Sequence, residues 1–388
     1  MGAILFAVAG LGVVLSLVQF LVLRHHLRPR EAGSFPRPPI SVLKPLCGVD
    51  DDLEANLTSF ADLPYPAYEV LLGVRDRSDA AWPVAHAASR RWPGRFRLVL
   101  QRGEPGLNPK VNQLVGLAAA ARHDVLLVSD SNVRAPEGYL DDVARHLADP
   151  GVGLVTHPVS GTGERSLGSA LENLQAAAAV GPATVAAQRL AGRDVVVGKS
   201  MAFRRRDLVA LGGFEAVRNF LAEDFVLGVN IGRKLGMRVA IGAVAVPGVS
   251  ERRTVSGFLA RYGRWCVMQR KIAGTPVAAA QALLYPLPFA LAGLAFAPCE
   301  ATIAATLGVW LAKALLDGAT ARAMRGHGFG LPILWLSPLK DLLFLFALVR
   351  ALGENTVQWR GNRLQVCAGS RLRRIPEPAA PGALALGR

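Results

Sequence analysis

The chain has 388 residues, which is enough for one sizeable soluble domain and several membrane segments. Its 44 Lys and Arg outnumber its 29 Asp and Glu, and this basic excess suits nucleic acid, an anionic membrane surface or a phosphorylated ligand. Hydrophobic residues make up 51% of the chain and gather at its two ends, which favours membrane lipids and argues against nucleic acid as a partner. Four cysteines without a CxxC spacing indicate neither a zinc site nor a disulfide framework; they are Cys47, Cys266, Cys299 and Cys367.

An uncharged segment opens the chain at residues 3–23, and a membrane-spanning helix needs about 20 apolar residues. A signal peptide is the alternative, but the basic region before its apolar core and a small-residue cleavage site after it are missing. Basic residues follow at once, namely Arg24, His25, His26, Arg28 and Arg30. Under the positive-inside rule, residues 1–24 form an anchor with the N-terminus outside, residues 25–39 form a Pro- and Arg-rich linker, and the following domain lies in the cytosol.

Residues 40–270 predict a soluble α/β domain. Short apolar runs alternate with helical patterns, at 40–43, 70–74, 96–100, 125–128 and 152–155. Such strands are typical of a mostly parallel sheet that is covered on both faces. Helices are expected to begin at residues 50–52 through an acidic cap, at Asn108 and Pro109 through an N-cap and a first-turn proline, and at Pro136.

Two aspartates, Asp76 and Asp130, follow strands of this predicted sheet, where open α/β sheets bind ligands. The chain has neither a GxxxxGK[ST] loop nor a GxGxxG loop between a strand and a helix, so a nucleotide would bind by another device. Asp130 and the Ser131-Asn132 turn could hold Mg²⁺ or Mn²⁺, because such a cation needs only one or two carboxylates besides substrate phosphates. The alternative is that Asp130 only caps a turn.

Two later motifs carry further candidate groups. Glu223 and Asp224 precede the helical run 225–231, and they fit either a base that takes a proton from an attacking hydroxyl or acids that complement a helix N-terminus. Arg261 and Arg264 share a helix face and could bind a departing diphosphate. The alternative, a basic amphipathic helix on anionic lipid, is compatible with that role.

Residues 271–350 predict membrane-embedded helices. Residues 272–299 are uncharged but contain four prolines, residues 301–316 contain one lysine, and residues 329–349 carry Lys340 and Asp341. We expect an outer helical turn at 298–300. The basic tail, residues 351–388, is expected inside, so one segment is re-entrant or interfacial, and the Pro-rich one is the candidate. Lys340 and Asp341 should point to different helix faces and snorkel from an interface.

Six motifs together resemble the ceramide glucosyltransferase family. In order they are VLKPLCGVDDDLEANL, YPAYEVLLGVRD, GLNPKVNQL, DSN, AEDF and RYGRW, and a closing VQWRGNRL is similar too. The resemblance covers residues 41–364 and implies an inverting enzyme with a GT-A type, Rossmann-like nucleotide-sugar-binding domain and transmembrane helices at both ends. It implies a multi-pass protein, in a bacterial inner membrane, with the catalytic domain in the cytosol.

The family motifs fall on Asp76, Asp130, Asp224, Arg261, Arg264 and Trp265. By this resemblance Asp76 contacts the nucleoside, Asp130 ligates Mg²⁺ or Mn²⁺, and Asp224 is the catalytic base. The two arginines contact the donor diphosphate, and Trp265 lines the sugar or acceptor site.

The chain departs from the family pattern at Asn132 and by having no histidine near residues 180–182, and two lysines are additional candidates. Asn132 replaces the second acid of a full D-x-D motif, so metal binding rests mainly on Asp130. Lys110 and Lys44 are further candidates for contact with the diphosphate, although a lone lysine is usually only solvated.

The resemblance implies transfer of a hexose, with glucose expected, from a UDP-sugar to the primary hydroxyl of ceramide. A hopanoid glycosyltransferase that uses UDP-N-acetylglucosamine is the first alternative, but its motifs read closer to ADDY and GSNRK than to the AEDF and GLNPK found here. A non-catalytic membrane scaffold has no reason to carry three acids and R-x-x-R-W along a ligand edge. A processive polysaccharide synthase needs more membrane helices.

Overall fold

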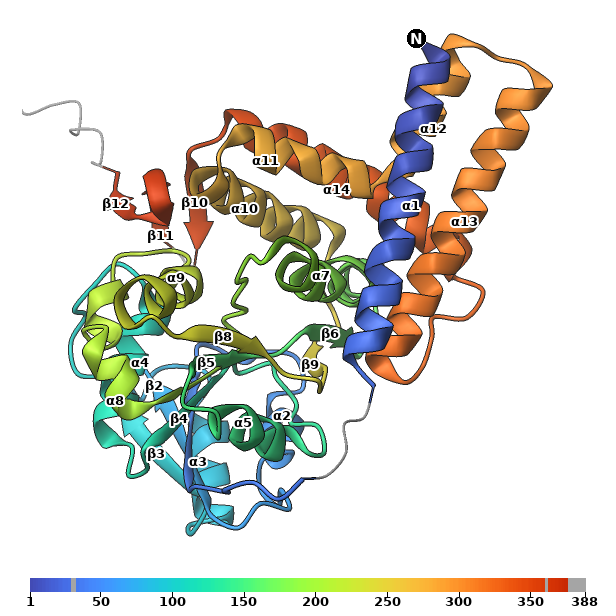
Figure 1. The fold of residues 1–388 in the computed structure, drawn as a ribbon. Helices are drawn as coiled ribbons and strands as arrows, with labels where there is room; N and C mark the ends of the chain where they lie inside the picture. Colours follow the sequence, from blue (N-terminus) through green and yellow to red (C-terminus); the bar gives the residue numbers. More distant parts are fainter. Residues whose placement is uncertain (29–32, 360–361, 376–388) are drawn as a thin grey trace, which may run out of the picture.

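The computed structural model describes residues 1–28, 33–359 and 362–375, so parts of the predicted linker (29–32) and tail (376–388) lie outside the described residues. A seven-stranded sheet forms its centre, with the strand order β3-β2-β1-β4-β7-β5-β8 (Figure 1). The strands are β1 (Ile40–Pro45), β2 (Tyr68–Val74), β3 (Phe96–Leu100), β4 (Val125–Ser129), β5 (Val152–Thr156), β7 (Ser200–Arg204) and β8 (Arg238–Ile241). Only β7 pairs antiparallel in this sheet, which confirms the mostly parallel sheet.

Helices cover both faces of this sheet. Successive side chains of a strand point to opposite faces, so Val70 and Leu72 enter one hydrophobic core cluster while Leu71 enters another. The helices of the first face are α2 (Leu53–Thr58), α3 (Trp82–Arg91) and α5 (Tyr139–Leu147). Those of the second face are α4 (Pro109–Ala120), α8 (Arg205–Ala210), the short η2 (Phe214–Val217) and α9 (Glu223–Leu235). Burial on both faces explains the near-continuous apolar strands.

The expected helix start at Asn108 is confirmed. The side-chain oxygen of Asn108 accepts the backbone N–H groups of Lys110 at 3.0 Å and Val111 at 3.1 Å. Pro109 is the first residue of α4, where its missing N–H costs no intrahelical hydrogen bond.

A helix does begin directly after residues 50–52, but the expected acidic side-chain cap and the expected start at Pro136 are wrong. No side chain of residues 50–52 caps α2. Asp50 and Asp51 instead accept hydrogen bonds from groups far along the chain, namely Ser131 Oγ and the backbone N–H of Glu251. The third helix, α5, begins at Tyr139 rather than at Pro136.

A second layer of helices covers the top of the sheet domain in Figure 1. It contains α6 (Leu167–Gln175), which continues through the π-helical turn η1 (Ala176–Val180) into α7 (Gly181–Ala191), and α10 (Val255–Ala273), α11 (Thr275–Ala280) and α14 (Ile333–Gly353). Two small sheets flank it: parallel β6 (Val159–Thr162) and β9 (Val246–Val249), and antiparallel β10 (Thr356–Trp359), β11 (Asn362–Val366) and β12 (Leu372–Arg374).

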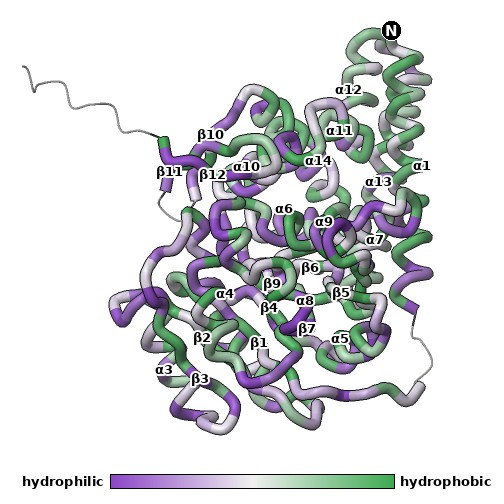
Figure 2. Tube along the Cα trace, turned by 60° about the vertical axis from the view of Figure 1, so that its left-hand side comes forward, coloured by the Kyte–Doolittle hydropathy of each residue, from purple (hydrophilic) through white to green (hydrophobic). Residues whose placement is uncertain are grey.

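Three helices project from this layer as a bundle: α1 (Gly2–His26), α12 (Pro286–Phe296) and α13 (Glu300–Arg325) (Figure 1). Figure 2 shows α1 as hydrophobic along most of its length. In the described part of the chain, α1 and α13 are long and apolar enough to cross a membrane. The Pro-rich segment folds as a pair bent by 78°, Thr275–Leu284 and Pro286–Phe296, which is a broken span or a re-entrant loop. These helices mark the chain as a membrane protein.

The segment predicted as a further crossing, 329–349, folds differently. Its helix α14 is not among the candidate spans and packs along α10. The expectation that Lys340 and Asp341 snorkel apart is wrong, because both are fully buried and their charged groups lie 3.0 Å apart. Lys340 also lies 2.8 Å from Asp317 of α13, so the charges tie two helices together.

Candidate active site

Lys110 lies at the centre of a charged cluster at the carboxyl edge of the sheet. Its ammonium nitrogen lies 2.9 Å from Asp130 Oδ1 and 3.0 Å from Glu223 Oε1. The same nitrogen donates to the carbonyl oxygen of Gly198 at 2.8 Å. Asp130 directly follows β4 and Glu223 opens α9, so distant segments converge where parallel strands end.

The lysines near Asp130 keep it charged. Burial raises the pKa of the Asp130 carboxyl, but Lys110 and Lys199 outweigh burial and lower this pKa below its ordinary value. Burial also lowers the pKa of Lys110, but Asp130 and Glu223 outweigh it and raise that pKa. The Asp130 side chain remains 28% exposed, so its carboxylate is an anionic ligand open to the edge of the sheet.

Asp224 lies beside this cluster in a different environment. Its Oδ2 accepts the backbone N–H of Gly198 and its Oδ1 that of Phe225, both at 2.8 Å. Burial, reinforced by the charge of Glu223, raises the pKa of Asp224 to about 7. The residue is partly exposed. A reachable carboxyl that titrates near neutrality suits general-base chemistry.

Glu223 is committed to structural contacts. It is 5% exposed, and its Oε2 accepts a hydrogen bond from Asn108 Nδ2 at 3.1 Å while its Oε1 pairs with Lys110. Of the two adjacent acids, only Asp224 therefore has a carboxylate that could meet a substrate.

Two groups of the segment before β7 were not found from the sequence. A Cβ at Gly198 would lie 2.9 Å from Asp224 Oδ2 and 3.1 Å from Lys110 Nζ, so only glycine lets the backbone approach both charges. Lys199 donates to Asn132 Oδ1, and burial followed by the charge of Arg261 lowers the pKa of Lys199 to about 8. The only sequence signal is a Gly-Lys-Ser without P-loop spacing.

Lys44 holds the turn after β4 through hydrogen bonds from the buried side of the sheet domain. It is fully buried, and it donates to Ser129 Oγ at 3.2 Å, to the carbonyl oxygen of Asp130 at 2.9 Å and to that of Val133 at 3.3 Å. Burial lowers the pKa of Lys44 to about 7. These contacts fix the backbone of the turn rather than offer the lysine to a diphosphate.

The turn itself offers one carboxylate for a metal. The side chain of Asn132 is used within the protein, because its Nδ2 donates to the carbonyl oxygen of Val249 at 3.1 Å and its Oδ1 accepts from Lys199. Among the described residues no three His, Cys, Asp or Glu side chains gather to hold a metal. A cation at Asp130 would take its remaining ligands from a phosphorylated substrate and water, as Mg²⁺ usually does.

Arg261 on α10 forms an ion pair with the buried acid Glu172. Its Nη1 lies 2.9 Å from Glu172 Oε1, and Arg253 pairs with the other oxygen of Glu172. Burial lowers the pKa of Arg261, but nearby acidic groups, led by Glu172, together outweigh burial and raise this pKa above its ordinary value. The Arg261 guanidinium carbon also lies 5.6 Å from the centre of the Trp265 ring.

The other predicted residues lie further out. Arg264 is partly exposed one turn along α10. Asp76 follows β2 and is separated from Asp130 by β1, which corresponds to about 10 Å between the strand ends. It accepts the backbone N–H of Ser78 at 2.8 Å, and hydrogen bonds from Ser78 and Arg75 lower its pKa to about 2. The structure thus places Asp76 on the same edge but not in contact with the cluster.

The C-terminal segment holds the loop that leads to Asp224. Ser370 is buried with φ 67°, its Oγ accepts the N–H of Ala222 at 3.3 Å, and its carbonyl oxygen accepts that of Leu221 at 2.9 Å. From the other side, Asn108 Nδ2 donates to the carbonyl oxygen of Phe220 at 2.8 Å. We call these contacts between Ser370 and residues 221–222 the clamp. No local sequence signal indicates it, because the membrane helices separate its two segments in the sequence.

The sheet topology, with ligand-binding residues expected at its carboxyl edge, is that of a GT-A type fold. A solved structure with the same fold is the mannosyltransferase PcManGT from Pyrobaculum calidifontis in complex with GDP-Man and Mn²⁺, with a TM-score of 0.51 over 91% of this chain and 99% of that chain, at 19% identity. The chain belongs to glycosyl transferase family 21, whose model matches residues 4–372.

Curated relatives agree with this family. Ceramide glucosyltransferase 1 of Caenorhabditis elegans is 26% identical over 348 residues, which are 87% of this chain and 73% of the relative. Ceramide glucosyltransferase 3 of the same organism is 26% identical over 365 residues, 90% of this chain and 77% of the relative. The chain is therefore a hexosyltransferase, and the predicted resemblance to the ceramide glucosyltransferase family is confirmed.

Proposed function

We propose that the chain transfers glucose from UDP-glucose to the primary hydroxyl of a ceramide, with inversion at the anomeric carbon. The observation that carries this proposal is the convergence of Asp130, Lys110 and Asp224 at the carboxyl edge of the sheet. The names of the curated relatives support the sugar and the lipid.

Asp224 is the base in this proposal. Its carboxylate takes the proton of the lipid hydroxyl as the hydroxyl oxygen forms a bond to the anomeric carbon. The bond from that carbon to the UDP oxygen breaks, and its electron pair leaves with UDP. Because the new bond forms on the face opposite the leaving group, the configuration inverts. The raised pKa of Asp224 supports this role.

Basic residues would bind the donor diphosphate. Lys110, Arg261 and Arg264 would neutralise the charge that develops on it, and arginine suits phosphate because its planar fork binds two oxygens. Asp76 would contact the nucleoside and Trp265 the sugar. For Arg261 this requires a shift away from its partner Glu172 or a contact shared with it.

Mg²⁺ or Mn²⁺ would be held by Asp130 together with the two phosphates of the donor. When bound there, the cation neutralises charge on the leaving group. The exposed Asp130 carboxylate supports this, as does the Mn²⁺ in the mannosyltransferase of the same fold. Lys110, which pairs with Asp130, would share that carboxylate with the cation or move to the diphosphate.

The protein would be multi-pass, with its catalytic domain in the cytosol. The basic residues Arg24, His25 and His26 end α1, and Arg322 and Arg325 end α13. Both helices approach the sheet domain at these ends, whereas the N-terminus and the turn between α12 and α13 lie together at the far end of the bundle (Figure 1). The positive-inside rule then favours the cytosol for the sheet domain.

One experiment decides between the candidate reactions. The purified full chain is incubated with ceramide or a hopanoid and with UDP-glucose, UDP-galactose, UDP-glucuronate or UDP-N-acetylglucosamine, and the lipids are analysed by mass spectrometry. We expect a hexosylceramide from UDP-glucose. Transfer of N-acetylglucosamine to the hopanoid alone would contradict the proposal and favour the hopanoid alternative.

A further inference from the structure

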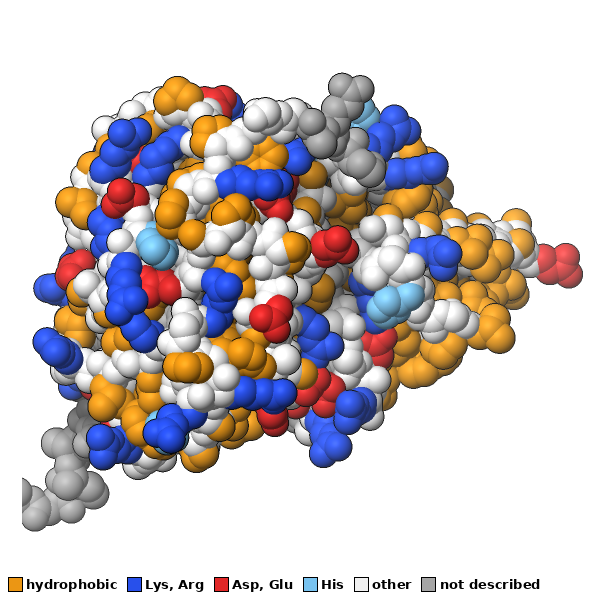
Figure 3. All heavy atoms as spheres, turned by 90° about the horizontal axis from the view of Figure 1, so that it is seen from below, with side chains coloured by type: hydrophobic (Ala, Val, Ile, Leu, Met, Phe, Trp, Pro, Cys, Tyr) orange, Lys and Arg blue, Asp and Glu red, His pale blue; other side chains and the backbone are white. Residues whose placement is uncertain are grey.

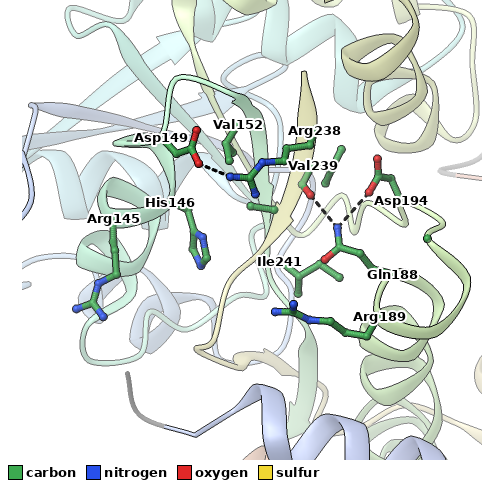
Figure 4. A pocket seen from close by; sticks show the side chains of 12 residues that line it. Arg145, His146, Asp149, Val152, Gln188, Arg189, Asp194, Arg238, Val239 and Ile241 are labelled. Carbon is green, nitrogen blue, oxygen red and sulfur yellow. Dashed lines mark hydrogen bonds and ion pairs between the residues drawn. The ribbon is translucent and has the colours of Figure 1, made fainter. Parts of the chain in front are cut away.

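A cavity of about 740 Å³ lies at one edge of the sheet, next to the end of α1 (Figure 4). The end of α5, the start of β5, the edge strand β8 and the end of α7 enclose it. None of its lining residues belongs to the charged cluster around Lys110, so the cavity is separate from the candidate active site.

Arginines outnumber aspartates in the lining by three to two. The ionisable lining residues are Arg145, His146, Arg189, Arg238, Asp149 and Asp194. Arg238 pairs with Asp149, and Asp194 accepts a hydrogen bond from Gln188 at 3.1 Å. Within the described ranges, Arg145 and Arg189 lie within ion-pair distance of no carboxylate. Arg189 Nη2 lies 3.2 Å from His26 Nδ1, and the Arg145 guanidinium carbon lies 4.9 Å from the centre of the Phe35 ring, so neither charge is neutralised by these contacts. A guanidinium is the group that best matches a phosphate.

The end of α1 sets the depth of the cavity relative to the membrane. Leu23 is the last residue of the uncharged segment, and His26 lies three residues later, about 4.5 Å further along the helix axis. The Nδ1 atom of His26 lies 3.2 Å from Arg189 Nη2, and its Nε2 atom lies 3.0 Å from the carbonyl oxygen of Gly242, next to the lining strand β8. Arg189 is thus level with the headgroup layer if α1 spans the hydrocarbon core.

The surroundings of the cavity are basic as well. Arg24 and His25 stand on the last turn of α1, and Figure 3 shows Lys and Arg spread over the sheet domain beside the hydrophobic bundle. Clusters of basic residues just beyond a membrane helix attract anionic lipids, and each contributes about fivefold to the affinity. A membrane surface also supplies phosphodiesters at a high local concentration, which favours a lipid over free phosphate.

We propose that this cavity binds the phosphodiester of an anionic phospholipid headgroup in the leaflet that faces the sheet domain. Arg189 contacts the phosphate oxygens, Arg145 adds positive charge at the other side of the cavity, and the headgroup lies between α5, β8 and α7 (Figure 4). The inference rests on the membrane placement proposed above, but it does not depend on which sugar or acceptor the enzyme uses.

Lipid retention by the full chain tests this site. The protein is purified in detergent with an equimolar mixture of phosphatidylglycerol and phosphatidylcholine, and retained lipids are identified by native mass spectrometry without donor or acceptor. We expect selective retention of phosphatidylglycerol. The double variant Arg145→Gln/Arg189→Gln should lose about 25-fold of this preference, from about fivefold per arginine. The control Arg90→Gln removes an exposed arginine from α3, beside the opposite edge of the sheet. This variant should keep the wild-type preference for phosphatidylglycerol.

Three results would overturn the proposal: equal retention of the two lipids, a preference that survives in the double variant, or an equal loss in the control. Displacement of the lipid by inorganic phosphate at equal concentration would mean a site for free anions, which also contradicts it. Glycosyl transfer is measured separately in phosphatidylcholine alone. If transfer fails while the lipid preference stands, the proposed function is wrong and this site is not.

Discussion

Asp224 and Glu223 are adjacent and chemically alike, yet the fold gives them different surroundings. Successive residues at a helix start point about 100° apart, so one carboxylate can turn into the interior while the other faces the ligand edge. Glu223 turns toward Lys110 and Asn108, and Asp224 turns toward Gly198. This difference supports the assignment of Asp224 as base and gives the assignment a direct test.

The first prediction compares the two acids. Asp224→Asn keeps the shape but loses the proton acceptor, so turnover should fall by about 10² to 10⁴ while UDP-sugar affinity is kept. Glu223→Gln keeps an acceptor for Asn108 and should be much milder. Turnover and donor affinity are measured in both variants. If Asp224→Asn retains more than about a tenth of wild-type turnover and Glu223→Gln is inactive, the base is Glu223.

The second prediction concerns pH. The base works only when deprotonated, and the pKa of Asp224 is raised to about 7, so kcat/KM should fall as the pH drops through that value. Since the charge of Glu223 helps to raise this pKa, the acid limb should move to lower pH in Glu223→Gln. The measurement is the pH profile of kcat/KM for both proteins. An unchanged limb in the variant would argue against Asp224 as the titrating group.

The third prediction concerns the metal. Asp130 is the one carboxylate that the turn after β4 offers, so Asp130→Ala should abolish turnover, and excess EDTA should inhibit the wild type until Mg²⁺ or Mn²⁺ is added. Binding of Mn²⁺, followed by electron paramagnetic resonance in the presence of UDP, should weaken in the variant. Full turnover in excess EDTA would leave Lys110, Arg261 and Arg264 to stabilise the diphosphate alone.

At the scale of elements, the sequence predicts what local patterns determine. All five predicted strands are present. Four of them are buried on both faces, which requires a nearly continuous apolar run, whereas the edge strand β3 is only partly buried. The Asn108 cap is present because the cap and its partners lie within three residues. The antiparallel strand β7 is not predicted, because its apolar run after Ser200 is short. Its position in the sheet, between the earlier strands β4 and β5, is not indicated by any local pattern.

The predictions that failed depended on distant partners. Lys340 is buried because Asp317 approaches it from another helix, and no side chain of residues 50–52 caps α2 because all three carboxylates bind groups on other loops. The same limit applies to the candidate site. Strand ends and family motifs indicated Asp130 and Asp224, but the contacts of Lys110 with Glu223 and of Arg261 with Glu172 exist only after folding.

The fourth prediction concerns the clamp formed by the C-terminal segment. Ser370→Ala leaves the buried N–H of Ala222 without its acceptor, which should cost about 1–3 kcal/mol of stability. Turnover should fall more than donor affinity, because the loop before Asp224 loses a fixed position. Ser370→Gly removes the same hydroxyl but suits the positive φ, so it should be less harmful than alanine. Thermal unfolding and kcat measure both effects, and Ser89→Ala on α3 is the control. If Ser370→Ala and the control had the same thermal stability and the same kcat, the Ser370 contacts would not hold the loop before Asp224.

At the scale of the whole molecule, the cysteines allow the proposed topology to be tested. Cys299 is exposed in the turn between α12 and α13, whereas Cys47 lies in the sheet domain. A membrane-impermeant thiol reagent added to intact cells should label Cys299, and Cys47 should react only after permeabilisation. Cys266 is buried and cannot report on either side. Labelling of Cys47 in intact cells would reverse the orientation, and a Cys299→Ser variant identifies the labelled residue.

The clamp at Ser370 also determines when the loop before Asp224 can reach its final position during synthesis of the chain. A ribosome makes α1 and the sheet domain first, then α12, α13 and α14, and only then the segment 368–372 that holds the loop before Asp224. The sheet domain can therefore fold early, but the loop before Asp224 lacks its contacts with Ser370 until the later helices have been made. Only then can the segment 368–372 pack against that loop. A newly made molecule would remain inactive until this final contact forms, so its first turnover would take place at the membrane, where the proposed lipid acceptor would be bound.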